Sequence, residues 1–223
     1  MRFSFLLYFY LSSAVVLIIS LLGLPLKYKK FRFFVNLFTK NMLISLRLFQ
    51  IRTKVINAEL ASKDGYLFAS KHQSMFETIY YNHLFYNPAY ILKKELLSIP
   101  LFGTYLKKLG MIAIDRSQGI QSLRYVNELT ASYSKYRPVI IFPEGTRTTY
   151  KEEPDLKPGI YSMYKSLNKP VVPISLNSGK FWPKNNKVKA GIITIEFREP
   201  IPPGLGKQEF LKRLKNEINS LNH

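Results

Sequence analysis

The sequence contains no cysteine, which excludes disulfides, thiol catalysis and cysteine-based zinc sites. Histidine is also scarce: His72, His83 and His223 are the three present, and so few disfavour a histidine-rich metal site. Acidic residues are outnumbered, with 14 Asp and Glu against 33 Lys and Arg, giving a formal net charge of +19. That excess predicts an anionic partner, which is nucleic acid, an anionic lipid surface or a phosphorylated small molecule.

Charged residues are missing altogether from residues 3–26. About 20 apolar residues are enough to cross a bilayer, so this stretch predicts a membrane helix. It has no good small-residue cleavage site, which favours a retained anchor over a cleaved signal peptide. Lys27, Lys29, Lys30 and Arg32 follow it directly. The positive-inside rule therefore places the rest of the chain on the cytoplasmic side, at the inner membrane if the source is bacterial.

A second apolar stretch, residues 31–51, is interrupted by three basic side chains. Because charges at the bilayer centre are costly, we expect a helix lying at the interface rather than a second full span. A helix buried against the folded domain is the alternative. Residues 1–50 are thus predicted to anchor the protein to an anionic phospholipid membrane, and residues 51–223 to form a single catalytic domain.

After residue 52 the pattern changes to short strand-like runs that alternate with helix-length segments. This alternation predicts an α/β fold, a mostly parallel sheet flanked by helices, with functional residues at the carboxyl ends of strands. The predicted strands are 53–57, 65–70, 89–92, 111–114, 138–142, 170–176 and 188–197. The predicted helices are 74–86, 94–109, 119–136, 159–168 and 207–222.

A histidine and a carboxylate, His72 and Glu77, stand at the junction of the apolar run 66–69 and a helix-like segment. On one continuous helix they would be about 140° apart, so they can meet only if the chain turns between them. In that case the carboxylate accepts a hydrogen bond from one ring nitrogen and leaves the other to take a proton, a general-base arrangement. The alternative is structural: Ser74 as the N-cap and Glu77 three residues later form a capping-box pattern.

Arg116 follows a second strand-like run, 111–114. Its guanidinium predicts either a phosphate clamp or an ion pair with Asp115, and the residues alone leave both open. Lys93 and Lys94 follow strand 89–92, and we expect them to be solvated charges at the start of a helix.

The run Phe142-Pro-Glu-Gly-Thr-Arg-Thr148 follows a third strand-like segment. Gly145 allows backbone N–H groups to approach an anion closely, and Thr146 and Arg147 add further donors. Glu144 is unusual in so positive a loop, and we expect it to order Arg147 or a substrate hydroxyl. The combination predicts a phosphate-binding loop.

Together these motifs resemble the 1-acylglycerol-3-phosphate acyltransferase family over residues 50–205. The family has four blocks in order: a histidine, four residues and an aspartate; a strand ending in Ile-Asp-Arg; the run Phe-Pro-Glu-Gly-Thr-Arg; and a proline within a hydrophobic strand. This sequence matches them at 72–77, 110–116, 142–147 and 171–174.

Two positions depart from the family pattern. Glu77 replaces the usual aspartate, and Lys71 replaces the usual asparagine before the histidine. Glutamate is one methylene longer but keeps the charge and the acceptor oxygens, so the pair with His72 is expected to survive a small adjustment.

The resemblance implies transfer of an acyl group from acyl-CoA or acyl-acyl carrier protein to the sn-2 hydroxyl of lysophosphatidic acid. It implies His72 and Glu77 as catalytic residues, with no cofactor or metal and no nucleic-acid partner. Lys157 is a further candidate helper. The implied phosphate-binding residues are Arg116, Glu144, Gly145, Thr146 and Arg147.

Two rival functions are an acyltransferase of the same fold with another acceptor, glycerol 3-phosphate or a lyso-aminolipid, and a non-catalytic binder of anionic lipid or nucleic acid. Trp182 is expected to line the acyl path, to sit at the membrane interface or to pack in the core. His83 and His223 are expected to be surface or packing residues, and 207–215 to lie on an amphipathic helix.

Overall fold

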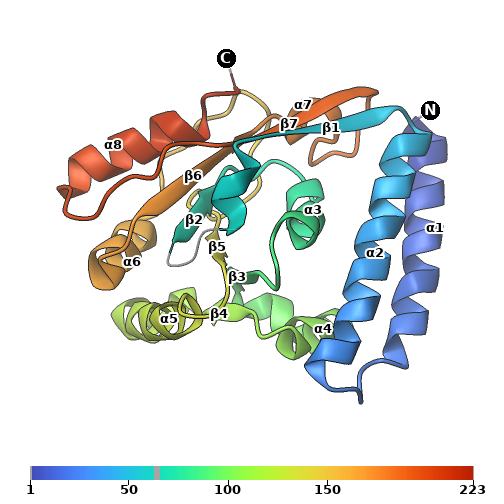
Figure 1. Ribbon diagram of the computed structural model, residues 1–223, viewed down its shortest axis with the longest axis horizontal. Helices are drawn as coiled ribbons and strands as arrows, with labels where there is room; N and C mark the ends of the chain where they lie inside the picture. The colour runs from blue at the N-terminus through green and yellow to red at the C-terminus, as the bar shows by residue number, and fades with distance from the viewer. Residues whose placement is uncertain (1, 63–65, 223) are drawn as a thin grey trace.

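The computed structural model describes residues 2–62 and 66–222, with side chains from Phe3 onward. Met1, residues 63–65 and His223 lie outside the described part, and with them the predicted start of the strand 65–70 and the expectation for His223. Strands and helices alternate through the rest of the chain, which confirms the predicted α/β class (Figure 1).

A mostly parallel sheet forms the centre of the fold, in the order β1-β7-β6-β2-β5-β3-β4. The pairing of β6 with β7 is antiparallel, and each other neighbouring pair is parallel. The central strands are buried along their whole length, as expected for parallel strands covered on both faces. The strands are β1 Ile51–Ile56, β2 Leu67–Ser70, β3 Ala89–Lys93, β4 Ile112–Ile114, β5 Val139–Ile141, β6 Val171–Leu176 and β7 Gly191–Phe197.

Helices cover both faces of the sheet. In Figure 1, α5 (Gly119–Tyr133), α6 (Gly159–Leu167) and α8 (Lys207–Ile218) lie on one side, and α3 (Phe76–Leu84) lies on the other. Alternate residues of β2 show the division: Leu67 and Ala69 join the cluster under α6 and α8, whereas Phe68 joins the cluster with α3. The C-terminal helix is amphipathic as predicted, with Phe210, Leu214 and Ile218 buried.

The predicted helix 94–109 is wrong as a single element. A short 3₁₀ turn, Lys94–Ser98, comes first, and α4 begins only at Phe102. Pro100 accounts for the break, because proline lacks the N–H that a helix needs and pushes the residue before it out of the helical region. A four-residue helix, α7 (Ser178–Phe181), was not predicted and follows β6 directly.

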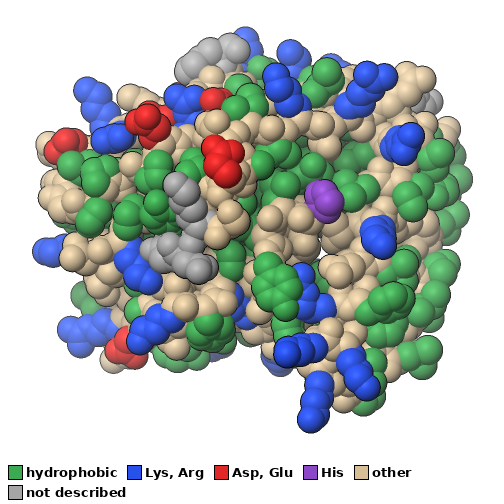
Figure 2. Space-filling view, viewed as in Figure 1, with side chains coloured by type: hydrophobic (Ala, Val, Ile, Leu, Met, Phe, Trp, Pro, Cys, Tyr) green, Lys and Arg blue, Asp and Glu red, His purple; other side chains and the backbone are tan. Residues whose placement is uncertain are grey.

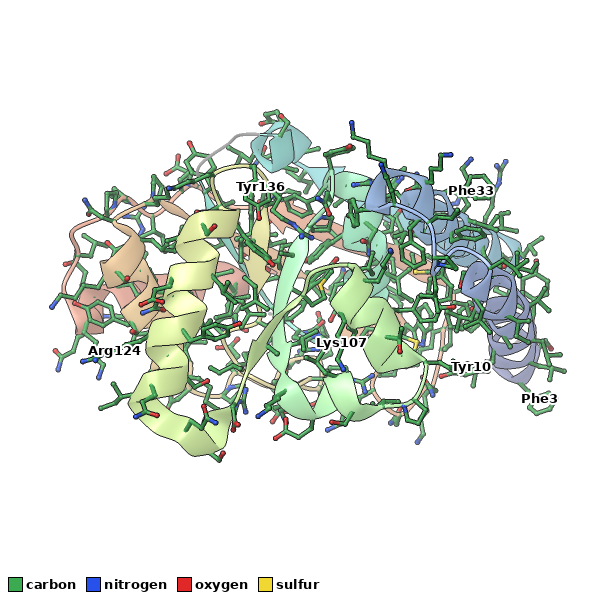
Figure 3. All side chains as sticks on the ribbon, turned by 90° about the horizontal axis from the view of Figure 1, so that it is seen from below. Phe3, Tyr10, Phe33, Lys107, Arg124 and Tyr136 are labelled. Atoms are coloured by element: carbon green, nitrogen blue, oxygen red, sulfur yellow. The ribbon has the colours of Figure 1, made fainter. Side chains whose placement is uncertain are left out.

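Two antiparallel helices, α1 (Arg2–Leu21) and α2 (Tyr28–Leu48), lie along one edge of the molecule (Figure 1). Within the described residues, α1 alone is long and apolar enough to cross a membrane, over Phe3–Leu21 with a mean hydropathy of 2.1. Its outward face carries exposed side chains such as Phe3 and Tyr10 (Figure 3). Figure 2 shows hydrophobic surface along this edge of the molecule.

The inner face of this helix pair packs on the domain. The rings of Phe5 and Phe9 meet Trp182 edge-on, each at 5.0 Å between centroids, and Trp182 is fully buried. Of the alternatives for Trp182, core packing is therefore correct. Met42 and Leu46 of α2 join the same cluster, so α2 lies against the folded domain on this side.

Candidate active site

His72 and Glu77 meet because the chain turns between them. His72 follows β2, and α3 begins at Phe76, so residues 73–75 reverse the direction and bring His72 Nδ1 to 2.8 Å from Glu77 Oε1. The carboxylate accepts, so Nδ1 carries the proton and Nε2 is left as the acceptor. The imidazole stacks on Phe142 at 4.1 Å between centroids, and its side chain remains 16% exposed.

Glu77 also supports the turn that precedes the helix. Its Oε1 accepts hydrogen bonds from the backbone N–H groups of Gln73, at 2.6 Å, and Ser74, at 2.7 Å. The N-cap is Met75, one residue later than predicted, and the Ser74 hydroxyl accepts from Phe76 N–H at 3.1 Å. The same carboxylate oxygen thus serves both the turn and the imidazole.

The loop after β5 lies beside His72 because β2 and β5 are parallel neighbours, with Ala69 opposite Ile141. The Thr148 N–H donates to the carbonyl of His72 at 2.8 Å and fastens the two loops together. Gly145 has φ +71°, a left-handed conformation that favours glycine, and its N–H donates to the Phe142 carbonyl at 2.9 Å.

Arg116 reaches this loop from the end of β4. Its Nη2 donates to the Gly145 carbonyl at 3.2 Å, and a Cβ at Gly145 would lie only 2.7 Å from that nitrogen. Asp115 instead pairs with Lys94 at 3.0 Å and accepts from Ser117, and these hydrogen bonds lower the pKa of Asp115, with Ser117 the larger cause. Asp115 thus forms its ion pair with Lys94 rather than with Arg116, and the guanidinium of Arg116 lines the cleft.

Glu144 requires a correction. Its carboxylate is buried and bonds Lys71 Nζ at 2.6 Å, and its second oxygen accepts from the backbone N–H of His72 at 3.1 Å. It therefore orders the backbone of His72 rather than Arg147 or a substrate hydroxyl. Burial raises the pKa of Glu144, and the cation of Lys71 opposes that rise. A buried carboxylate neutralised by its own lysine is also unsuited to bind a phosphate.

A cleft of about 840 Å³ opens beside His72 and Arg116. Its polar end is formed by His72, Arg116 and the loop residues Gly145, Thr146 and Arg147, together with Lys157. Apolar side chains of helices α1 to α6 line much of the remainder, including Leu17 of α1, Phe31, Phe34 and Phe38 of α2, Ile79 of α3, Leu106 of α4, Leu123 of α5 and Met163 of α6. In Figure 3, α4 lies between α5 and the α1–α2 pair. The cleft thus fits an amphipathic molecule with an anionic end.

A family model described as Acyltransferase matches residues 52–177. The chain belongs to the acyltransferase family. The 1-acyl-sn-glycerol-3-phosphate acyltransferase of Pseudomonas aeruginosa is 36% identical over 135 residues, covering 60% of this chain and 52% of that protein. The enzyme of the same name from Escherichia coli is 25% identical over 137 residues, covering 60% and 56%. The chain spans about half the length of these curated relatives.

The fold has a counterpart among solved structures. The crystal structure of the 1-acyl-sn-glycerophosphate acyltransferase from Thermotoga maritima superposes with a TM-score of 0.78 and covers 99% of this chain and 95% of that one. Identity is 20%, so the likeness is one of fold. It extends over the N-terminal helix pair as well as the sheet of this acyltransferase.

Two residues that support the site of the acyltransferase, Lys71 and Ser178, had no predicted role there. Lys71 is fully buried and links Glu144 to the carbonyl of Glu152, at 2.6 Å. Ser178 donates its hydroxyl to Glu77 Oε2 at 2.9 Å from a position 101 residues further along the chain. The departure from the family's asparagine at position 71 was a usable signal for the first, whereas no local pattern marks the second. In the described residues, no group of three or more His, Asp or Glu is placed to hold a metal.

Proposed function

We propose that this acyltransferase moves a fatty acyl group from an acyl thioester, acyl-CoA or acyl-acyl carrier protein, to the sn-2 hydroxyl of 1-acylglycerol-3-phosphate, giving phosphatidic acid. The observation that carries this proposal is the shared cleft: the imidazole of His72 and the cationic groups of Arg116 and Arg147 border one apolar-walled space. The names of the relatives from Pseudomonas aeruginosa and Escherichia coli agree with it.

In the proposed reaction His72 is the general base. Nε2 takes the proton of the acceptor hydroxyl as its oxygen attacks the thioester carbonyl, and the imidazolium then gives that proton to the departing thiolate. A hydrogen bond at 2.8 Å lets Glu77 hold the tautomer and stabilise the positive charge that forms on the ring. Stacking on Phe142 limits rotation of the imidazole.

The phosphate of the acceptor would lie against Arg116 and the loop 145–147, with Lys157 as a further cation. Arg116 is already directed at this loop by its bond to the Gly145 carbonyl. The acyl chain of the acceptor would fill the apolar part of the cleft, since apolar surface gains free energy when it leaves water. A non-acylated acceptor such as glycerol 3-phosphate would gain no apolar contact of its own there, which favours the lysolipid.

Residues 1–50 would anchor the enzyme to an anionic phospholipid membrane, with the catalytic part, 51–223, on the cytoplasmic side. The apolar exposed face of α1 supports contact with lipid, and the basic residues after it support this orientation. The open end of the site would then receive both a lipid acceptor from the membrane and a thioester from the aqueous phase.

The test uses the full chain purified in detergent and returned to anionic vesicles. It is incubated with lysophosphatidic acid, lysophosphatidylethanolamine or glycerol 3-phosphate, and with labelled acyl-CoA or acyl-acyl carrier protein, and the lipid products are identified by mass spectrometry. We expect phosphatidic acid from the first acceptor. His72→Ala should lose at least about 100-fold in rate, whereas His83→Ala, at an exposed position on α3, should keep full activity. Equal rates for wild type and His72→Ala would rule out the mechanism.

A further inference from the structure

The two oxygens of the Glu77 carboxylate have different partners. Oε1 accepts from His72 Nδ1 and from two backbone N–H groups, at 2.6 to 2.8 Å. Oε2 accepts from the hydroxyl of Ser178 at 2.9 Å. Glu77 and Ser178 are both fully buried. Both oxygens of this buried carboxylate are therefore hydrogen-bonded to other groups of the protein.

Sheet topology brings Ser178 to this position. It begins α7, immediately after β6, and β6 runs parallel to β2 with Ile174 opposite Ser70. The carboxyl ends of these two strands consequently lie side by side, with His72 after one and Ser178 after the other. A second bond ties the segments together, because Gly179 N–H donates to the side chain of Gln73 at 2.9 Å.

We propose that Ser178 is a positioning residue for proton transfer, which holds Glu77 so that Oε1 faces the imidazole of His72. This inference rests on the proposed function. The terminal torsion of a glutamate is broad, so a bond at one oxygen alone fixes the carboxylate plane poorly. Bonds at Oε1 and Oε2 together define that plane. A buried Oε2 without a donor would also be costly, and the carboxylate would turn to satisfy it.

A matched pair of variants isolates the hydroxyl. Ser178→Thr and Ser178→Val add the same bulk to a buried site, but only threonine can donate to Oε2. We expect Ser178→Val to lower kcat by about 10- to 100-fold relative to Ser178→Thr, the range for a hydrogen bond to a charged group. The acceptor KM should stay within about 2-fold, because the lost interaction concerns the proton transfer. Ser175→Ala is the control, since its equally buried hydroxyl faces Leu221 N–H.

The same substitutions in a Glu77→Gln background test whether the effect passes through Glu77. There, Ser178→Val and Ser178→Thr should differ by less than about 2-fold, because a positioning residue loses its influence when the group it positions is changed. An undiminished difference in that background would overturn the proposal. So would equal kcat values for the two variants in the wild-type background.

A measurement independent of turnover separates this inference from the proposed function. With three histidines in the chain, ¹⁵N-histidine labelling gives a simple spectrum, and His72→Ala assigns the low-field Nδ1 proton. We expect that resonance to persist in Ser178→Thr and to shift upfield or disappear in Ser178→Val. No acyl transfer by wild type would refute the proposed function, while an unchanged resonance in Ser178→Val would refute the role of Ser178.

Discussion

Replacing Lys71 by methionine should destabilise the protein severely, because it removes one half of a fully buried ion pair. Lys71 Nζ lies 2.6 Å from Glu144 Oε1, and the two side chains are 0% and 1% exposed. Methionine keeps most of the apolar stem but leaves the carboxylate of Glu144 without its cation. The substitution therefore changes charge more than packing.

The structure sets the expected magnitude. Breaking a buried pair by removing one partner costs about 3–5 kcal/mol, because an uncompensated charge remains in the interior. For a protein of this size that corresponds to a fall in Tm of roughly 6–20 °C. Lys94→Met removes a similar pair with Asp115, but Lys94 is 60% exposed, so we expect a loss of at most ~1 kcal/mol. Trp182, the one tryptophan, is buried and reports unfolding by its fluorescence.

The double variant Lys71→Met/Glu144→Gln should recover part of the loss, because it removes both charges and keeps an acceptor for His72 N–H. The pH dependence of stability gives a second test. Without Lys71, the pKa of Glu144 rises further above the ordinary value of 4.5. The free energy of unfolding of Lys71→Met should then be highest below pH 4.5 and should fall as the pH rises through the folded-state pKa of Glu144. The double variant should lack this dependence. A single variant no less stable than Lys94→Met, or a double variant no better than the single, would refute the reasoning.

Three further outcomes follow from the site and its support. Arg147→Ala should raise the acceptor KM about 10-fold and change kcat less, as measured with lysophosphatidic acid under steady-state conditions; an unchanged KM would contradict a phosphate contact. Gly145→Ala should also raise that KM, because a Cβ at φ +71° would meet Arg116 Nη2 at 2.7 Å and displace it, and should cost about 1–2 kcal/mol in stability. Arg137→Met should lower Tm by roughly 4–12 °C, equivalent to ~2–3 kcal/mol, without affecting KM, since the guanidinium donates to the carbonyls of Asn87, Pro88 and Leu109. The Tm values come from Trp182 fluorescence.

Local patterns were sufficient for most of the elements. Strand-like runs of four to ten residues predicted the seven strands of the described chain, and helix-length segments predicted α5, α6 and α8. The pattern failed where a single residue overrode it, as at Pro100, and where an element was too short to have a period, as in α7. The ends of some elements differ from the predicted bounds by a few residues: β7 begins at Gly191 instead of 188, and α8 ends at Ile218 instead of 222.

The motif at 72–77 shows where local reasoning stops. The sequence predicted that His72 and Glu77 meet only across a turn, and it left a capping role for Glu77 as the alternative. In the tertiary structure Glu77 has a second structural role beside its contact with His72, because the oxygen that bonds the imidazole also accepts from two backbone N–H groups of the turn before α3. A choice between the two was unnecessary, since one carboxylate oxygen can accept several hydrogen bonds.

By itself, the sequence determined the α/β class, the apolar N-terminal helix, and the residue types brought to the ends of β2, β4 and β5. These properties depend on neighbours along the chain, through periodicity, turn chemistry and charge. Only the tertiary structure decided that Lys71 neutralises Glu144, that Ser178 holds Glu77, and that α1, α2 and α4 wall the cleft. Those contacts join residues far apart in the chain. The first two exist because parallel strands bring their carboxyl ends to one edge of the sheet, and the third exists because the N-terminal helices pack their apolar side chains against the domain.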